Sequence, residues 1–385
     1  MGKWHKKSWQ KVKIIEQIPQ YSDHDALKVV QETLEQKKGL TTVKCIENLK
    51  LDIIAASKGQ AFLITGGNCA EELDFNKTNI TKTLNCINKI GKIISHAKPK
   101  LKIVQLGRMC GQFAKPRSSS TETINGVTLP SFKGEIINKS GFTKEEREPK
   151  PQLMLEAYDV CVQTKKVIDK YHSKFYIAHE ALLLQYEEAL VRKCNGGYYL
   201  ASTDLPWVGA RTVNPSGAHA EFLSGIINPV GIKIWDEFST KDFVKLVKTI
   251  NPKNVAGKIV LIIRAGAHKV NDTMLKFIKA VKDNKLQVVW TIDPMHANVK
   301  KIDGGIKTRF YEDILKETID FINVCYKNQI VPAGIHLELT GLSVTECIGL
   351  NVNKNNINSK YTTLCDPRLN GLQAVALAKE IAKVI

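Results

Sequence analysis

The chain has 385 residues, 43% hydrophobic and 24% charged, which is enough for a large core in one barrel with additions or in two domains. Its nine cysteines are irregularly spaced, and no apolar run approaches the roughly 18 residues of a membrane span, so a disulfide scaffold and a membrane protein are excluded. The formal net charge of +18 suits anions, but the lysines are scattered and no nucleic-acid motif occurs. A solvated basic surface or binding of small phosphorylated substrates therefore explains the charge better than nucleic acid does.

The first segment, residues 1–57, is predicted to be a helical N-terminal extension, because residues 23–34 combine an acidic cap with helical spacing of apolar residues. Beyond it, β-rich runs alternate with helical stretches. The predicted strands are residues 61–66, 101–107, 174–180, 197–203, 226–234, 258–265, 286–293 and 332–339. The predicted helices are residues 151–171, 181–193, 239–250, 271–284, 309–328 and 370–384.

Eight strands alternating with helices are typical of a (β/α)8 TIM barrel, an α/β fold. We therefore predict that residues 58–385 form a single catalytic barrel against which residues 1–57 pack. A long polar loop, residues 111–147, follows the second predicted strand. Long loops in compact domains are usually either functional or disordered, and the basic residues of this one favour function.

Four residues of metal-ligand type lie at or beyond the ends of apolar runs. Cys69, His296 and Glu338 each end such a run, and Asp366 follows Cys365 beyond the last predicted strand. In a β/α barrel, strand ends meet at the C-terminal face, where active sites lie. A buried thiol or an internally bonded histidine is the alternative for each position, and the mixed sulfur, nitrogen and oxygen set selects no single metal.

Basic residues also gather at the predicted strand ends. They are Arg108, Lys115, Arg117, Arg211, Lys233 and Arg264. An unpaired cation is costly at a buried strand end, so each requires an anionic partner. For a single residue an internal salt bridge is the simpler account. For several cations that converge on one barrel mouth, phosphate and carboxylate binding is the better interpretation.

Several longer motifs resemble those of the type II 3-deoxy-D-arabino-heptulosonate 7-phosphate (DAHP) synthase family, in its short form. The matching segments are residues 66–71, 111–118, 179–184, 207–212, 217–219, 228–233, 293–296, 307–309, 336–341, 344–349 and 365–370. They run through nearly the whole chain in the family's order. Chance cannot account for so many matches of this length.

The resemblance implies an enzyme of the first step of the shikimate pathway, which condenses phosphoenolpyruvate with erythrose 4-phosphate to give DAHP and phosphate. It implies a divalent metal, Mn²⁺ first and Co²⁺ or another ion as alternatives, held by Cys69, His296, Glu338 and Asp366. It implies phosphoenolpyruvate contacts from Arg108, Lys115, Arg211, Lys233 and Arg264. It implies aldose phosphate contacts from Lys115, Pro116, Arg117 and Ser118, with Lys233 and His296 as catalytic residues.

The chain departs from the family pattern beside this pocket: Ala210 and Val213 stand where Glu and Arg are usual. An enzyme that uses another aldehyde, such as an amino- or imino-substituted tetrose phosphate, is therefore one alternative. A non-catalytic barrel that binds phosphorylated metabolites is another. Short members also resemble enzymes of secondary metabolism. We expect small-molecule partners without nucleic acid or membrane, a homodimer, and a cytoplasmic location.

Overall fold

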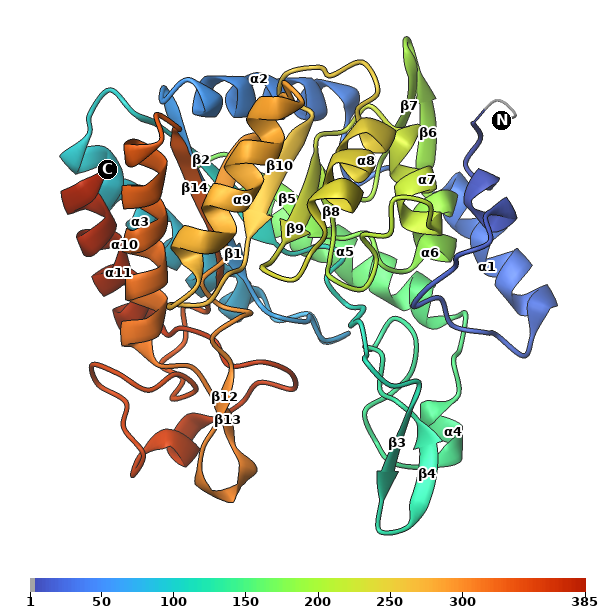
Figure 1. Cartoon of the computed structure of the whole chain (residues 1–385). Coiled ribbons are helices and arrows are strands. Elements are labelled where there is room, and N and C mark those ends of the chain that lie inside the picture. Colours follow the sequence, from blue (N-terminus) through green and yellow to red (C-terminus); the bar gives the residue numbers. More distant parts are fainter. Residues whose placement is uncertain (1–3) are drawn as a thin grey trace.

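The computed structural model describes residues 4–385, so the first three residues of the predicted N-terminal extension lie outside the described part. Eight parallel strands close into a barrel in the order β1-β14-β11-β10-β9-β8-β5-β2 (Figure 1). The barrel strands are β1 (Ala61–Gly67), β2 (Lys102–Arg108), β5 (Phe175–Glu180), β8 (Leu205–Val208), β9 (Val230–Ile234), β10 (Ile259–Ile263), β11 (Val289–Ile292) and β14 (Pro332–Glu338). The predicted (β/α)8 architecture is confirmed.

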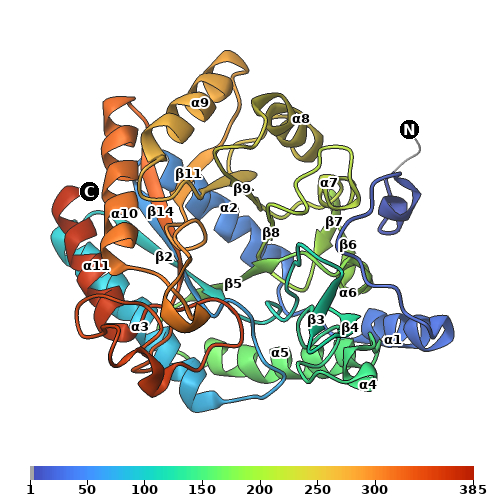
Figure 2. The same ribbon diagram turned by 60° about the horizontal axis from the view of Figure 1, so that its bottom comes forward.

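Most of the helices form an outer ring around these strands, as Figure 2 shows. The helices of the described residues are α1 (His24–Gln36), α2 (Val43–Ser57), α3 (Lys77–Ala97), α4 (Lys144–Arg147), α5 (Leu153–Asp169), α6 (Leu184–Ala189), α7 (Ala218–Ser224), α8 (Thr240–Ile250), α9 (Val270–Asp283), α10 (Tyr311–Lys327) and α11 (Gly371–Val384). Polar caps set several of their starts. Asn370, for example, begins α11 with a capping box completed by Gln373.

The barrel interior is a packed core, and α2 closes its N-terminal end. The interior cluster includes Leu106, Trp207 and Ile262 from the strands, and Leu49 and Ile53 of α2 belong to the same cluster. Figure 1 shows α2 lying across that end of the strands, while the long loops project from the opposite end. A helix that fills one end leaves the C-terminal end for a site.

Three two-stranded hairpins decorate the barrel: β3 (Thr121–Ile124) with β4 (Val127–Pro130), β6 (Val191–Cys194) with β7 (Gly197–Leu200), and β12 (Lys300–Lys301) with β13 (Lys307–Thr308). The first lies in the long polar loop predicted after the second strand. Together with α4, it gives that loop regular structure at the C-terminal end of the barrel (Figure 1).

The second hairpin corrects one sequence prediction. Residues 197–203 were expected to form the fourth barrel strand, but that strand is β8, which begins at Leu205. Tyr198 and Tyr199 do favour extended structure, and they form it in β7 instead. The predicted helix 181–193 is likewise limited to α6, because the chain turns into β6 at Val191.

The helix α3 occupies a gap for which the sequence predicts no helix. Its many Asn and Thr residues have low helix propensity. However, buried Leu84, Ile87, Gly91 and Ile94 recur at helical spacing, and this face packs on the barrel. Tertiary burial therefore overrides local propensity. Among residues 4–385, no helix has the length and hydrophobicity needed to cross a membrane.

Candidate active site

The C-terminal face holds a cavity of about 420 Å³ that collects nearly every candidate residue of the sequence analysis. Its lining includes Cys69, Arg108, Lys115, Pro116, Arg117, Ser118, Arg211, Lys233, Arg264, His296 and Asp366. Of the candidates, Glu338 alone is absent from this lining, since its side chain is fully buried below it. Residues 297 positions apart thus meet at one site, because the parallel strands all end at the same face.

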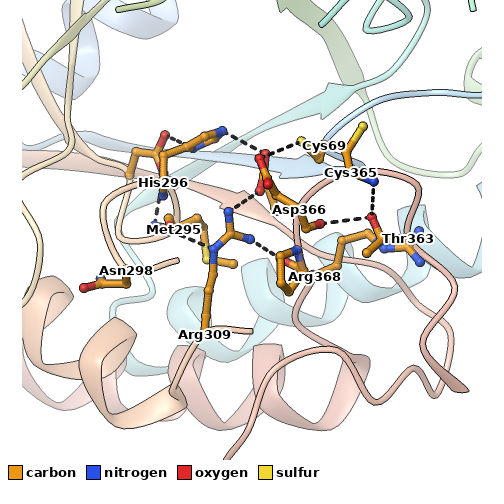
Figure 3. A network of polar contacts seen from close by, with 12 residues as sticks. Cys69, Met295, His296, Asn298, Arg309, Thr363, Cys365, Asp366 and Arg368 are labelled. Atoms are coloured by element: carbon orange, nitrogen blue, oxygen red, sulfur yellow. Dashed lines mark hydrogen bonds and ion pairs between the residues drawn. The ribbon is translucent and has the colours of Figure 1, made fainter. Parts of the chain in front are cut away.

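Three of the four predicted metal ligands form a compact cluster. The ligand atoms of Cys69, His296 and Glu338 all lie within 4.8 Å of one another. Asp366 lies beside them, with its Oδ2 3.6 Å from the Cys69 Sγ, but it is also paired with lysines. The Lys307 Nζ is 3.2 Å and the Lys115 Nζ 3.9 Å from its carboxylate. Figure 3 shows Cys69, His296 and Asp366 pointing toward one another.

This donor set suits a divalent metal. A thiol, an imidazole and a carboxylate are common ligands of zinc and other transition-metal ions, and the cluster is buried on one side and faces the cavity on the other. His296 has the second contact that metal-bound histidines need, because its Nδ1 is 2.6 Å from the Asp293 Oδ2. Its Nε2, 2.9 Å from the Glu338 Oε1, points into the cluster.

His296 lies between these two carboxylates. Burial alone would lower the pKa of the imidazole, but the fields of Asp293 and Glu338 outweigh burial and raise it to about 10. Burial would raise the pKa of Asp293, yet the nearby His296 and Lys233 hold it well below its ordinary value. The same two carboxylates that favour a protonated His296 would also favour a bound cation.

The buried Glu338 carboxylate is held by two arginines as well as by His296. The Arg309 Nη2 is 2.7 Å from Oε2, and the Arg108 Nη2 is 3.2 Å from Oε1. Burial would raise the pKa of Glu338, but His296 and Arg309 keep it well below its usual range. Arg309 also donates to the Met295 carbonyl at 2.7 Å, which ties the cluster to the His296 loop.

Phosphate-sized anions would meet a ring of cations next to this cluster. Lys233 reaches the Asp293 Oδ2 at 3.0 Å and lies near the Trp207 ring. Arg264 donates to the His296 carbonyl at 3.4 Å, and its buried Nε has no partner among the described residues. A guanidinium that is not fully satisfied at a cavity wall can donate to a bound carboxylate or phosphate.

Sequence reasoning missed Glu180 as a site residue, although it quoted the segment that contains it. This carboxylate lines the cavity at the end of β5, and its buried Oε1 has no partner among the described residues. Gly209 makes room for it, since a Cβ there would lie 2.3 Å from that oxygen. Burial raises the pKa of Glu180, while Lys233 and His296 act in the opposite direction.

Glu317, on α10, was also missed, because its sequence looks like an ordinary solvent-facing helix. Its Oε1 accepts from the Ala265 and Gly266 backbone N–H groups, both at 2.9 Å, and its Oε2 accepts from Asn298 at 2.6 Å. It thereby fixes the loops that follow Arg264 and His296. Burial raises the pKa of Glu317 to about 7.

We predict that Glu317→Gln destabilises the protein by about 1–3 kcal/mol, because an amide N–H₂ must then face a buried donor. The effect depends on pH. Since the folded-state pKa exceeds the ordinary value of 4.5, the folded protein binds the extra proton, and the wild-type advantage declines as pH rises from about 4.5 to about 7. Urea unfolding of both proteins across this range measures it. Equal stability at every pH would contradict the assignment.

The barrel thus carries a Cys/His/Glu cluster next to a wall of Arg and Lys side chains, an arrangement typical of enzymes with a metal site beside an anion-binding site. Comparison with known families is more specific. The chain belongs to the class-II DAHP synthetase family, whose family model matches residues 4–174 and 163–382.

Curated relatives of this chain are similar to it along nearly its whole length. A Neurospora crassa protein named phospho-2-dehydro-3-deoxyheptonate aldolase is 32% identical over 98% of this chain and 94% of its own length. A Streptomyces coelicolor protein of the same name is 31% identical over 96% and 94%. A Pseudomonas fluorescens protein, named probable phospho-2-dehydro-3-deoxyheptonate aldolase, is 31% identical over 93% of this chain and 92% of its own length. The first alignment spans 454 positions, so the Neurospora protein carries insertions that this chain lacks.

Proposed function

We propose that this protein condenses phosphoenolpyruvate with an aldose phosphate, erythrose 4-phosphate in the first instance, to give DAHP and phosphate. The observation that carries the proposal is the single cavity in which the metal-type cluster and the cations meet, in a chain of the class-II DAHP synthetase family. The names of the curated relatives support the same reaction. A non-catalytic barrel would not need to keep this cluster intact.

The deeper part of the cavity suits phosphoenolpyruvate. The residues proposed to bind it are Arg108, Lys115, Arg211, Lys233 and Arg264. Several come from strand ends, where packing holds them in place, so they can orient the carboxylate and phosphate without large rearrangement. Lys233 is buried beside Asp293 and His296. It is proposed as a catalytic residue because phosphoenolpyruvate bound by these cations would lie next to the Cys/His/Glu cluster at this point.

The rim of the cavity suits the phosphate group of the aldose phosphate. Lys115, Pro116, Arg117 and Ser118 belong to the loop after β2 and line the same cavity. Ser118 is exposed and Arg117 half-buried, so this loop is reached from solvent. A phosphate held here would direct the aldehyde of the same molecule inward, toward the cluster.

The cluster is proposed to hold Mn²⁺, with Co²⁺ or another divalent ion as alternatives, through Cys69, His296, Glu338 and Asp366. When bound, such an ion acts as a Lewis acid toward the aldehyde oxygen, where negative charge develops. Asp366, which is paired with Lys115 and Lys307, would complete the ligand set, and those lysines would then be free to face phosphate. His296 would bind the ion in its neutral form.

C3 of phosphoenolpyruvate attacks the aldehyde carbon, and the aldehyde oxygen takes up a proton to become a hydroxyl. Water adds at C2 and gives up a proton, and the C2–O bond to phosphate then breaks, which releases inorganic phosphate and leaves a ketone at C2. The cations hold two mutually repelling anions together, which is largely a proximity effect. The unpartnered Glu180 Oε1 is placed to hold a water against the cavity wall and to accept its proton.

The test is an assay of phosphoenolpyruvate consumption with a panel of aldose phosphates, with and without a chelator. Chelator-sensitive release of phosphate with erythrose 4-phosphate is expected. If no aldose phosphate in the panel supported consumption by metal-loaded protein, the proposal would be wrong.

A second candidate aldehyde is an amino-substituted tetrose phosphate, and one observation favours it. Ala210 lines both the main cavity and a neighbouring cavity of about 350 Å³, and Glu16 lines the latter. A small residue and a nearby carboxylate leave room and charge for an ammonium group. Preference for the amino sugar in the same panel would establish it, and a role in secondary metabolism would follow.

Two further properties belong to the proposal. The nine free thiols suit a reducing, cytoplasmic compartment. The assembly is proposed to be a homodimer, as the family resemblance implies, and light scattering tests it.

A further inference from the structure

The N-terminal segment crosses the rim of the cavity and is anchored on both sides. Ile14 pairs with Gly217, and the Ala218 N–H donates to the Ile14 carbonyl at 2.9 Å. Farther along, the Pro19 carbonyl accepts from the Gln185 side chain at 3.4 Å. Between these anchors the segment reaches the loop that carries Arg117.

Gln17 makes the contact. Its Nε2 donates to the Arg117 carbonyl at 3.1 Å, and its Oε1 accepts from the Arg117 N–H at 2.9 Å. One side-chain amide thus satisfies both main-chain groups of Arg117, as a neighbouring strand would. No other hydrogen bond to that main chain is present within residues 4–385.

The side chain of Arg117 is held separately. Its Nη2 is 3.0 Å from the Glu122 Oε2, and Glu122 also pairs with Arg147. Arg147 is buried and donates to the carbonyls of Gly141 and Pro130, at 2.6 and 3.1 Å. The guanidinium is therefore positioned by the β3–β4 hairpin, whereas Gln17 positions the backbone.

The backbone of Gln17 supports a specific role. Its φ of +64° lies in the left-handed region, which residues with a Cβ rarely adopt. Such a conformation persists where surrounding contacts hold it, and functional sites are where these conformations concentrate. Here it turns the amide toward the rim.

We propose that Gln17 is a positioning residue for the aldose phosphate subsite. By fixing the main chain of Arg117, it sets where Arg117 and the following Ser118 meet the second phosphate. Gln17 is not among the residues that line the cavity, so its proposed role is carried by Arg117 and Ser118. This inference rests on the proposed function, since it assigns a specificity role within that site.

Steady-state kinetics of Gln17→Ala and Gln17→Asn test the role. Asn keeps the amide and tolerates positive φ, but it is one methylene too short to span the gap. In both variants the KM for the aldose phosphate should rise about tenfold, from the loss of two hydrogen bonds that order the loop. The KM for phosphoenolpyruvate and kcat should stay within about twofold, because the strand-end cations are untouched.

Gln10→Ala is the matched control. Gln10 lies in the same segment, and its amide contacts Glu188 at 3.2 Å, away from the cavity lining. Its kinetics should equal those of wild type. If the Gln17 variants raised both KM values equally, or neither, the proposal would be overturned.

A second measurement does not depend on activity. Trypsin cleaves after Arg117, and the rate at the Arg117–Ser118 bond, followed by mass spectrometry, reports how firmly the loop is held. Faster cleavage in both Gln17 variants, but not in Gln10→Ala, supports the clamp even if the proposed reaction were wrong. Unchanged cleavage at this bond would overturn the inference even if the reaction were right.

Discussion

Cys69→Ser and His296→Ala should each lower kcat by at least about a thousandfold while the fold persists, because each removes one of the three ligand atoms of the compact cluster. Cys69 and His296 belong to the Cys/His/Glu cluster, whose ligand atoms lie within 4.8 Å of one another. Both are partly exposed to the cavity, so neither substitution opens a hole in the core. Turnover, bound metal after dialysis, and circular dichroism measure the three parts of this expectation.

Cys45→Ser is the matched control. Cys45 is a partly exposed free thiol on α2, at the opposite end of the barrel. Its metal content and rate should be those of wild type. Near-normal turnover by thoroughly metal-stripped wild-type protein would refute the metal assignment, whatever the variants do.

Arg264→Ala and Lys233→Ala should lower kcat/KM for phosphoenolpyruvate by about a hundredfold or more, since each removes a charge-assisted contact at the cavity wall. The KM for the aldose phosphate should change far less, because the Lys115–Ser118 loop is a separate element. Initial rates with each substrate varied in turn separate the two effects.

Lys269→Ala serves as the control for charge alone. Lys269 is exposed on the loop that follows Arg264, where it pairs with Asp236 at 2.8 Å outside the main cavity. The Lys269→Ala substitution should leave the KM values for phosphoenolpyruvate and for the aldose phosphate unchanged. A larger change in the aldose KM than in the phosphoenolpyruvate KM of the Arg264 or Lys233 variants would show that the two subsites are exchanged.

The barrel and most of the cavity lining could be predicted from the sequence, because strand ends are marked by apolar runs. Buried parallel strands read as apolar segments, and the residue after each run is forced to the C-terminal face. Cys69, Lys233, Arg264 and His296 were found in this way. Strand four was misplaced because the Tyr198–Tyr199 pair produces an equally strong extended signal in a hairpin.

The residues that were missed act through contacts that sequence spacing does not encode. Glu317 lies on a helix, and Gln17 lies 100 positions from the arginine it holds. Arg309 belongs to one of the matching motifs, but its bond to Glu338 depends on how the segment before α10 meets the end of β14. Local patterns identify a strand end, whereas such partners are defined only when distant segments meet.

The helix α2 has a consequence for kinetic order. Because α2 fills the N-terminal end of the barrel, the strand-end cations are open only to the C-terminal end, where the Arg117 loop lines the same cavity. An aldose phosphate bound on that loop would obstruct access to the deeper cations, so we expect phosphoenolpyruvate to bind first. An unreactive aldose phosphate analogue should therefore inhibit uncompetitively with respect to phosphoenolpyruvate, and competitive inhibition would show that either molecule can enter first.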